Sequence, residues 1–93
     1  MTQKILTPKE RQALKQQAHH LNAVVMIGQN GLTDAIIHEV DSSLTAHELI
    51  KIKVMGDDRA EREAIFQNLC DTLNAHPVQH IGKQLVLWRP NES

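Results

Sequence analysis

Aromatic residues are scarce in this chain of 93 residues, which contains one tryptophan, one phenylalanine and no tyrosine. Recognition of nucleic acid by base stacking requires exposed aromatic rings, so base stacking cannot be the main way in which this protein would bind nucleic acid. The single cysteine, Cys70, excludes an internal disulfide framework and is typical of a reducing compartment. No apolar run is long enough to span a bilayer, and Met1–Lys4 leads into a capped helix instead of a signal peptide. We therefore expect a cytoplasmic protein without a membrane segment.

Net charge is also low, with a formal value of −1 at pH 7. This balance argues against a protein that binds a polyanion over its whole surface. The charges are nevertheless unevenly distributed. Every Asp, Glu, Lys or Arg residue in the segment 31–48 is acidic, whereas the only such residues in the segment 49–56 are Lys51 and Lys53. Solvated helix faces explain the acidic segments well, but they explain two lysines within an apolar segment less well.

The length and a hydrophobic content of 41% predict one small domain, residues 1–93, with a core from about residue 7 to residue 90. Helices are expected to begin at Thr7, at Thr33 and at Asp57 or Asp58, where each residue can cap the following turn. Four segments predict strands: Ala23–Ile27, Leu49–Val54, about Val78–Ile81, and Gln84–Arg89. The order helix-strand-helix-strand-helix-strand-strand predicts an α/β fold with a mixed four-stranded sheet, in which each helical crossover joins parallel neighbouring strands and the terminal hairpin adds an antiparallel pair.

Three features refine the expected sheet. The segment Ala23–Ile27 is apolar throughout, which predicts a central strand. In Leu49–Val54 the side chains alternate, so the two lysines should lie on the face opposite to the isoleucines. Gly82-Lys83 then predicts a two-residue hairpin turn of type II′, because glycine occupies its first position.

The tetrapeptide Gly28-Gln29-Asn30-Gly31 lies where the first strand is expected to lead into a helix beginning at Thr33. Glycine permits positive φ and a close approach by another backbone, and a helix start offers unpaired N–H groups. This combination suits a phosphate, and GxxG loops clamp nucleotide backbones in RNA-binding modules. Taken alone, the four residues are explained at least as well by an ordinary turn.

The chain as a whole resembles the CRM domain, an RNA-binding module named for chloroplast RNA splicing and ribosome maturation, and within it the bacterial stand-alone YhbY-like form. The matching stretches run in the family's order from about Thr7 to Pro90: Ala18-His19 with Leu21, Val24 to Thr33, His47 to Lys53, Asp58-Arg59, Val78 to Lys83, and Leu85 to Pro90. The resemblance implies a fold similar to the C-terminal domain of translation initiation factor three. It also implies binding of ribosomal RNA in precursors of the large ribosomal subunit.

We therefore predict an RNA-binding surface that joins the loop to nearby basic groups. Its residues are Gly28, Gln29, Asn30, Gly31, Thr33, Lys51, Lys53, Lys15 and Lys83, with Arg11 and His19 as further candidates. Lysines on a strand have another use, since they also keep an edge strand from pairing with other chains. His19 is explained more simply as a packing or capping residue.

Other kinds of site have little support. The six histidines do not combine with Cys70 in a metal-ligand spacing, and no residue is placed to activate that thiol. Trp88 shares a strand face with Val86 and is expected in the core, and the acidic residues 57–63 suit a helix start. We predict a monomer with no catalytic activity, cofactor or metal. The alternative is a protein-interaction adaptor that uses the acidic second and third helices.

Overall fold

The structure is a computed structural model of the chain, and it describes residues 6–91. Met1–Lys4, in which we expect no signal peptide, lies outside these residues. The elements follow in the predicted order: α1 (Pro8–Ala18), β1 (Ala23–Ile27), α2 (Asp34–His47), β2 (Leu49–Val54), α3 (Arg59–Leu73), β3 (His76–Ile81) and β4 (Gln84–Trp88). The small α/β fold and the mixed four-stranded sheet are confirmed.

The helices begin where their capping residues predict. Thr7 and Glu10 form a capping box, in which each side chain accepts a hydrogen bond from the backbone N–H of the other. Thr33 Oγ1 accepts from the N–H of Ile36 at 3.2 Å and caps α2. Asp58 caps α3 by accepting from Ala60 and Glu61. Each cap satisfies backbone donors that the first helical turn leaves without a partner.

The strand order in the sheet is β1-β2-β4-β3. The parallel pairing of β1 with β2 follows from the crossover through α2. Strand β4, however, lies between β2 and β3 and is antiparallel to both, so the expectation that every helical crossover joins neighbouring strands is wrong for β2 and β3. The hairpin turn places positive φ at Gly82 (54°) and not at Lys83, as predicted for type II′.

The prediction that Ala23–Ile27 is central is wrong, because β1 is an edge strand that pairs only with β2. Its apolar side chains lie on the two opposite faces of the sheet. Val25 and Ile27 are buried, whereas Val24 and Met26 are 45% and 59% exposed. A run of apolar residues therefore marks a strand here without marking burial on both faces. The other edge strand, β3, begins at His76 and includes Pro77, which an edge position tolerates because fewer ladder hydrogen bonds are required there.

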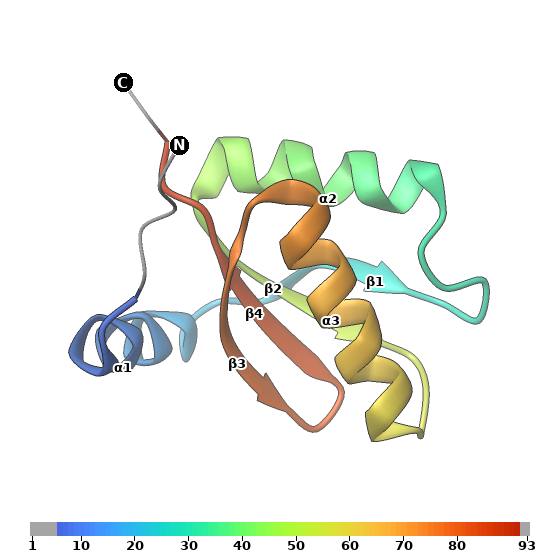
Figure 1. The fold of residues 1–93 in the computed structure, drawn as a ribbon, viewed down its shortest axis with the longest axis horizontal. Coiled ribbons are helices and arrows are strands. Elements are labelled where there is room, and N and C mark those ends of the chain that lie inside the picture. Colours follow the sequence, from blue (N-terminus) through green and yellow to red (C-terminus); the bar gives the residue numbers. More distant parts are fainter. Residues whose placement is uncertain (1–5, 92–93) are drawn as a thin grey trace.

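Helices α2 and α3 cover one face of the sheet and enclose the main core (Figure 1). This core combines the inward side chains of the strands with Val40, Leu44, Phe66, Leu69 and Cys70. Both helices direct apolar side chains toward the sheet, and Cys70 acts as a small apolar residue among them. None of the helices within residues 6–91 has both the length and the apolar character needed to cross a bilayer.

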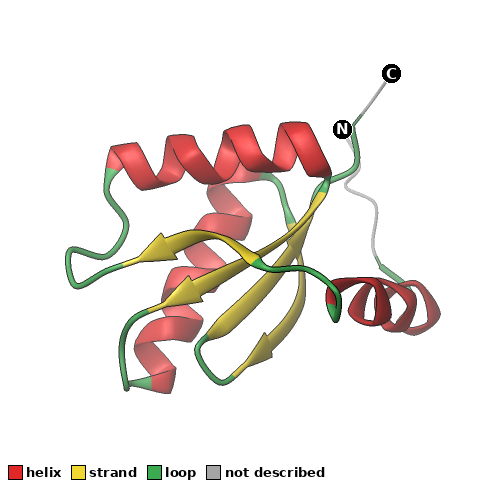
Figure 2. Ribbon diagram, turned by 180° about the vertical axis from the view of Figure 1, so that it is seen from behind, coloured by secondary structure: helices red, strands yellow, loops and turns green. Residues whose placement is uncertain are grey.

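The other face of the sheet is only partly covered, by α1 at one end (Figure 2). There Leu14 and Ala18 pack on Val78 and Val86, and Trp88 lies against this second cluster, with its ring centroid 5.5 Å from that of His76. The predicted packing role of Trp88 is therefore confirmed. We call the remainder of this surface, built from β1 to β4 beyond the end of α1, the open face.

Arg89, which directly follows β4, joins three elements at the end of the sheet. Its Nη1 donates to Asp41 Oδ1 at 2.7 Å and to the Leu73 carbonyl at 3.1 Å, while Nη2 donates to the Asp41 carbonyl and to Thr45 Oγ1. The Arg89 N–H also donates to the Glu48 carbonyl. The planar guanidinium thus holds the ends of α2 and α3 against the last strand.

We expect Arg89→Met to lower the free energy of unfolding by about 2 kcal/mol, because charge-assisted hydrogen bonds are lost and Asp41 loses its partner. Urea unfolding of this variant, compared with that of Arg59→Met at an exposed position, measures the effect. Equal midpoints for the two variants would contradict the role assigned to Arg89.

Burial, with further contributions from Asp71 and Glu63, raises the pKa of the Cys70 thiol to about 12. Since the thiolate is the reactive form, we expect Cys70 of the folded protein to resist a thiol reagent at pH 8 and to react rapidly once urea has unfolded the chain. Absorbance from Ellman's reagent measures both rates. A fast reaction without urea would show that the thiol is accessible.

Candidate nucleic-acid interface

The loop Gly28–Gly31 connects the end of β1 to the start of α2, as predicted. The Gly31 N–H donates to the Gly28 carbonyl at 3.1 Å, which closes a tight turn. Gly31 has φ of 67°, a conformation that glycine adopts without strain, whereas Gly28 does not have positive φ. Together with Thr33 and Ile36, the four loop residues line a cleft of 370 Å³.

Several backbone donors at this turn are unused. In the part of the chain that the structure describes, the N–H groups of Gln29, Asn30, Asp34 and Ala35 donate to no protein acceptor. Two of them belong to the first turn of α2, where the helix dipole also favours a negative group. The loop and the helix start can therefore provide hydrogen bonds to an anion such as a phosphate.

The open face begins beside this loop. Strand register places Met26, Lys53, Gln84 and Ile81 in one row across all four strands, next to the end of β1 that leads into the loop. Met26 and Ile81 are more than half exposed. In the following row Lys51 lies between Ala23 and Val86. The face therefore combines two cations with amide and apolar side chains.

Lys51 and Lys53 lie on the side of β2 opposite to Ile50 and Ile52, as their alternation predicts. Because β2 is flanked by β1 and β4, these lysines do not protect an edge strand, and that explanation of them is wrong. On an interior strand, the two cations lie on a solvent-accessible face that no helix of the described chain covers completely.

The remaining predicted cations are more dispersed. Lys83 lies in the hairpin turn near the loop, but its Nζ is 3.1 Å from Asp57 Oδ1. Lys15 belongs to α1, at the opposite end of the molecule from the loop (Figures 1 and 2). Arg11, also on α1, lines a groove with residues of α3 and β3. His19 is the C-terminal capping residue of α1 and lies exposed near Lys51.

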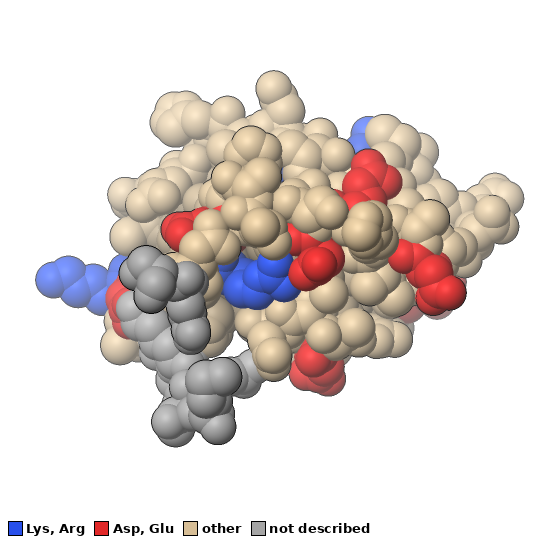
Figure 3. All heavy atoms as spheres, turned by 90° about the horizontal axis from the view of Figure 1, so that it is seen from above, with Lys and Arg blue, Asp and Glu red and all other residues tan. Residues whose placement is uncertain are grey.

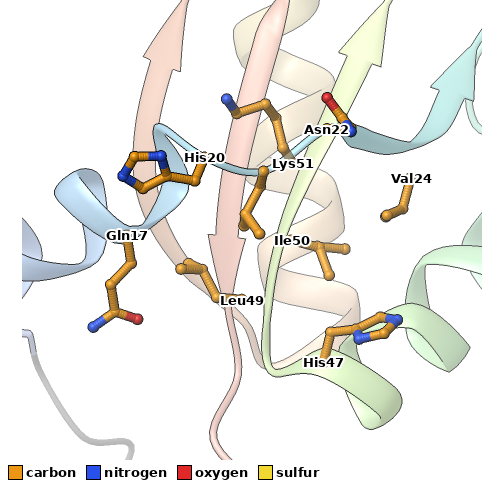
Figure 4. A pocket seen from close by; sticks show the side chains of 9 residues that line it. Gln17, His20, Asn22, Val24, His47, Leu49, Ile50 and Lys51 are labelled. Atoms are coloured by element: carbon orange, nitrogen blue, oxygen red, sulfur yellow. The ribbon is translucent and has the colours of Figure 1, made fainter.

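A wider cleft of 570 Å³ lies where the segment after α1 passes the end of α2 (Figure 4). Its polar lining comes from two distant parts of the chain: Gln17, His20 and Asn22 from one, and His47 and Lys51 from the other. Val24 and Leu49 add apolar surface. Since Lys51 also borders the open face, this cleft extends the candidate interface toward α1.

On its other side, the loop forms one wall of a second cleft, which has a volume of 320 Å³. The opposite wall is the start of α3, including Asp58, Glu61 and Arg62. Arg62 is 7% exposed and is the only charged residue that is buried within residues 6–91. The sequence patterns predict no role for it, although its position four residues before the buried Phe66 places it on the inward side of the helix.

Several acidic residues are engaged within the protein. Asp41 binds Arg89, Glu48 accepts from the Asn91 N–H, and Asp58 caps α3. On the side that α2 covers, the acidic groups are scattered over the surface, and one of them lies against a basic group (Figure 3). Among residues 6–91, no three histidine, cysteine or acidic side chains come together as a group that could hold a metal ion.

The fold and site thus define a small α/β domain with a GxxG loop beside a basic, partly apolar sheet face. Residues 6–89 match the CRS1 / YhbY (CRM) domain, and the chain belongs to this family. It is 48% identical to a Haemophilus influenzae protein named RNA-binding protein, over 94% of this chain and 88% of that protein. It is 36% identical to a probable RNA-binding protein of Pseudomonas aeruginosa, over 92% of this chain and 83% of that one.

The fold itself has a solved counterpart. The solution structure of a Staphylococcus aureus protein superimposes with a TM-score of 0.85 at 27% sequence identity, covering 96% of this chain and 93% of that chain. The arrangement of helices and strands described above is therefore shared by a protein that differs in most of its residues.

The two glycines of the loop should respond differently to substitution. A Cβ added at either position would have no atom within 4 Å, but only Gly31 has positive φ. We expect Gly31→Ala to lower the free energy of unfolding by about 1 kcal/mol, and Gly28→Leu to leave it unchanged. Urea unfolding measures both.

Gly28→Leu is then a clean probe of the loop surface, because the added side chain blocks approach without straining the turn. We expect this variant to bind single-stranded RNA more weakly than the wild-type protein does. Full affinity in a variant of unchanged stability would remove Gly28 from the interface.

Proposed function

We propose that this protein is a non-catalytic RNA-binding protein, which holds the RNA backbone at the Gly28–Gly31 loop and along the open face of the sheet. The observation that carries the proposal is the position of Lys51 and Lys53 on an interior strand, with their side chains on the uncovered face near the loop. Free N–H groups at the loop and lysines on the sheet are complementary to a chain of phosphates.

Membership of the CRM domain family supports this proposal, since relatives that span most of this chain are named as RNA-binding proteins. The scarcity of aromatic residues is consistent with it as well, because contacts to phosphate and ribose need no stacking platform. Gln29 and Asn30 add neutral donors and acceptors that can reach ribose or a base edge.

The adaptor alternative has less support, because two acidic residues on its helices already have partners within the protein. Asp41 on α2 contacts Arg89, and Glu63 on α3 contacts His80. Asp34, Glu39, Glu61 and Asp71 form no ion pair within residues 6–91, but relatives that span most of this chain are named as RNA-binding proteins.

In a finer form, we propose that the RNA is ribosomal and that the protein acts in the cytoplasm as a monomer during assembly of the large ribosomal subunit. This step rests on the resemblance to the YhbY-like members of the family. Crosslinking in cell extract, followed by sequencing of the bound RNA and sedimentation of the protein with subunit precursors, tests it. Crosslinks confined to RNAs other than ribosomal RNA would contradict this finer proposal.

The two lysines of β2 provide the sharpest test of the interface. We expect Lys51→Glu with Lys53→Glu to abolish most RNA binding at moderate salt. The slope of log K against log salt should become shallower by about 1.4, since each phosphate contact on a single strand contributes roughly 0.7. Fluorescence anisotropy with a labelled single-stranded RNA, measured over a range of salt concentrations, gives both values.

A matched control reverses the same number of charges elsewhere. Lys9→Glu with Arg59→Glu changes two exposed cations on α1 and α3 and should weaken binding much less. A flat salt dependence in the wild-type protein, or equal losses in the two double variants, would defeat the interface as located here.

A further inference from the structure

Exposed apolar side chains are concentrated on the open face. Among residues 6–91, the large apolar residues that are exposed are Val24, Met26, Met55 and Ile81. Strand register places Met26 and Ile81 on the open face, and Val24 borders it at the cleft beside α1. Met55, by contrast, lines the cleft on the other side of the loop. Contacts with the RNA backbone do not account for this apolar surface, because phosphates are complementary to cations and hydrogen-bond donors.

Met26 and Ile81 occupy the two ends of one row across the sheet, with Lys53 and Gln84 between them. Neighbouring strands are about 4.8 Å apart, so the two ends are separated by about 14 Å at the backbone. Both apolar side chains are more than half exposed, whereas Lys53 is only partly exposed. Partly covered lysines lay their methylene groups along apolar surface and keep the ammonium group in water. The row therefore presents apolar surface at both ends and a cation near its middle.

The sheet is hollowed beside Ile81. A depression of 180 Å³ lies between the end of α1 and the β3–β4 hairpin, and its lining includes Lys51, Gln79, Gln84 and Ile81. Gln84 is exposed and Gln79 is partly exposed, so solvent reaches both side chains. Each amide has donors and an acceptor. The hollow thus combines an apolar wall with polar groups that can bind the edge of a planar base.

We propose that the open face binds unpaired bases, with Met26 and Ile81 each covering the plane of one base. The inference rests on the proposed RNA-binding function and extends it, since a protein that contacts only phosphates would accept duplexes as well as single strands. Apolar side chains cover bases in proteins that hold them outside a duplex, and the removal of both apolar surfaces from water is favourable. The ligand is therefore single-stranded RNA whose bases are turned toward the sheet.

A duplex fits this face less well. Its bases are stacked and paired inside the helix, and its wide, shallow minor groove presents base edges and 2′-hydroxyl groups, which are polar. Met26 and Ile81 would remove water from those polar groups without forming hydrogen bonds to them. A single strand suits both kinds of group on the face, because its phosphates can pair with Lys51 and Lys53 while its bases cover the apolar ends of the row.

The test compares three RNA ligands: a short oligouridylate, the same oligonucleotide with abasic central residues, and the oligouridylate annealed to oligoadenylate. The abasic ligand keeps every phosphate, so it isolates the contribution of the bases. We expect the wild-type protein to bind the oligouridylate about tenfold more tightly than the abasic ligand, which is roughly the effect of covering half of two such side chains. The duplex should also bind more weakly than the oligouridylate. Fluorescence anisotropy at one salt concentration measures all three affinities.

Met26→Thr with Ile81→Thr removes most of the apolar surface and introduces a residue type that strands favour. The affinity of this variant for the oligouridylate should fall about fivefold, while its affinity for the abasic ligand stays unchanged. Its slope of log K against log salt should match that of the wild-type protein, because no cation is lost. Met55→Thr changes an exposed methionine outside the open face and should keep the wild-type affinities.

A spectroscopic measurement on the unmodified protein makes the test independent of how the variants fold. The carbon-13 methyl NMR signal of Met26 should shift on addition of the oligouridylate and not on addition of the abasic ligand. The methyl signal of Met55 serves as the reference. A Met26 signal that stays in place with the bound oligouridylate would contradict the base contact.

The outcomes separate the two proposals. If the wild-type protein binds none of the three ligands, the RNA-binding function is overturned, and this inference with it. If it binds the abasic ligand or the duplex as tightly as the oligouridylate, only the base contact is overturned and the backbone interface stands. Full oligouridylate affinity in a folded Met26→Thr, Ile81→Thr protein would overturn the role of both residues and leave their apolar surface to a protein partner.

Discussion

Incomplete covering of the sheet is the constraint on which the candidate interface depends. Helices α2 and α3 enclose one face, but α1 has 11 residues, so it is about 16 Å long in a molecule whose longest extent is 34 Å. It can bury the second cluster at one end and no more. Val24, Met26 and Ile81 stay exposed next to Lys51 and Lys53, a combination that a self-contained domain would be expected to cover. The short helix therefore keeps available the surface that we assign to RNA.

Local features of the fold could be predicted from the sequence because they depend on neighbouring residues. The caps at Thr7, Thr33 and Asp58 satisfy donors within one turn, and the glycine-first turn at Gly82 needs only two residues. The alternation in β2 likewise assigned its lysines to one face. Sheet order depends instead on contacts between distant segments. The residues of Ala23–Ile27 do not indicate that β1 pairs with one strand only. The hairpin residues likewise do not indicate that β4 also pairs with β2.

The candidate site shows the same division. The loop and the two lysines of β2 follow from patterns within short segments, whereas the cleft around Arg62 joins the loop to α3 and could not be read along the chain. The one available signal was a charged residue on the inward side of a helix, four positions before Phe66. Lys83 is a further example, because its pairing with Asp57 depends on two loops that meet only in the folded protein.

The insertion of β4 between β2 and β3 has a consequence for synthesis. A nascent chain that ends before Gln84 contains three of the four strands, yet β2 and β3 then have no partner between them, and the middle of the sheet is missing. The two halves of the hydrophobic interior can join only after the last strand has left the ribosome, and Arg89 follows immediately to bind α2 and the end of α3. Folding of this domain is therefore completed by β4 and Arg89, which are synthesised after its other strands and helices.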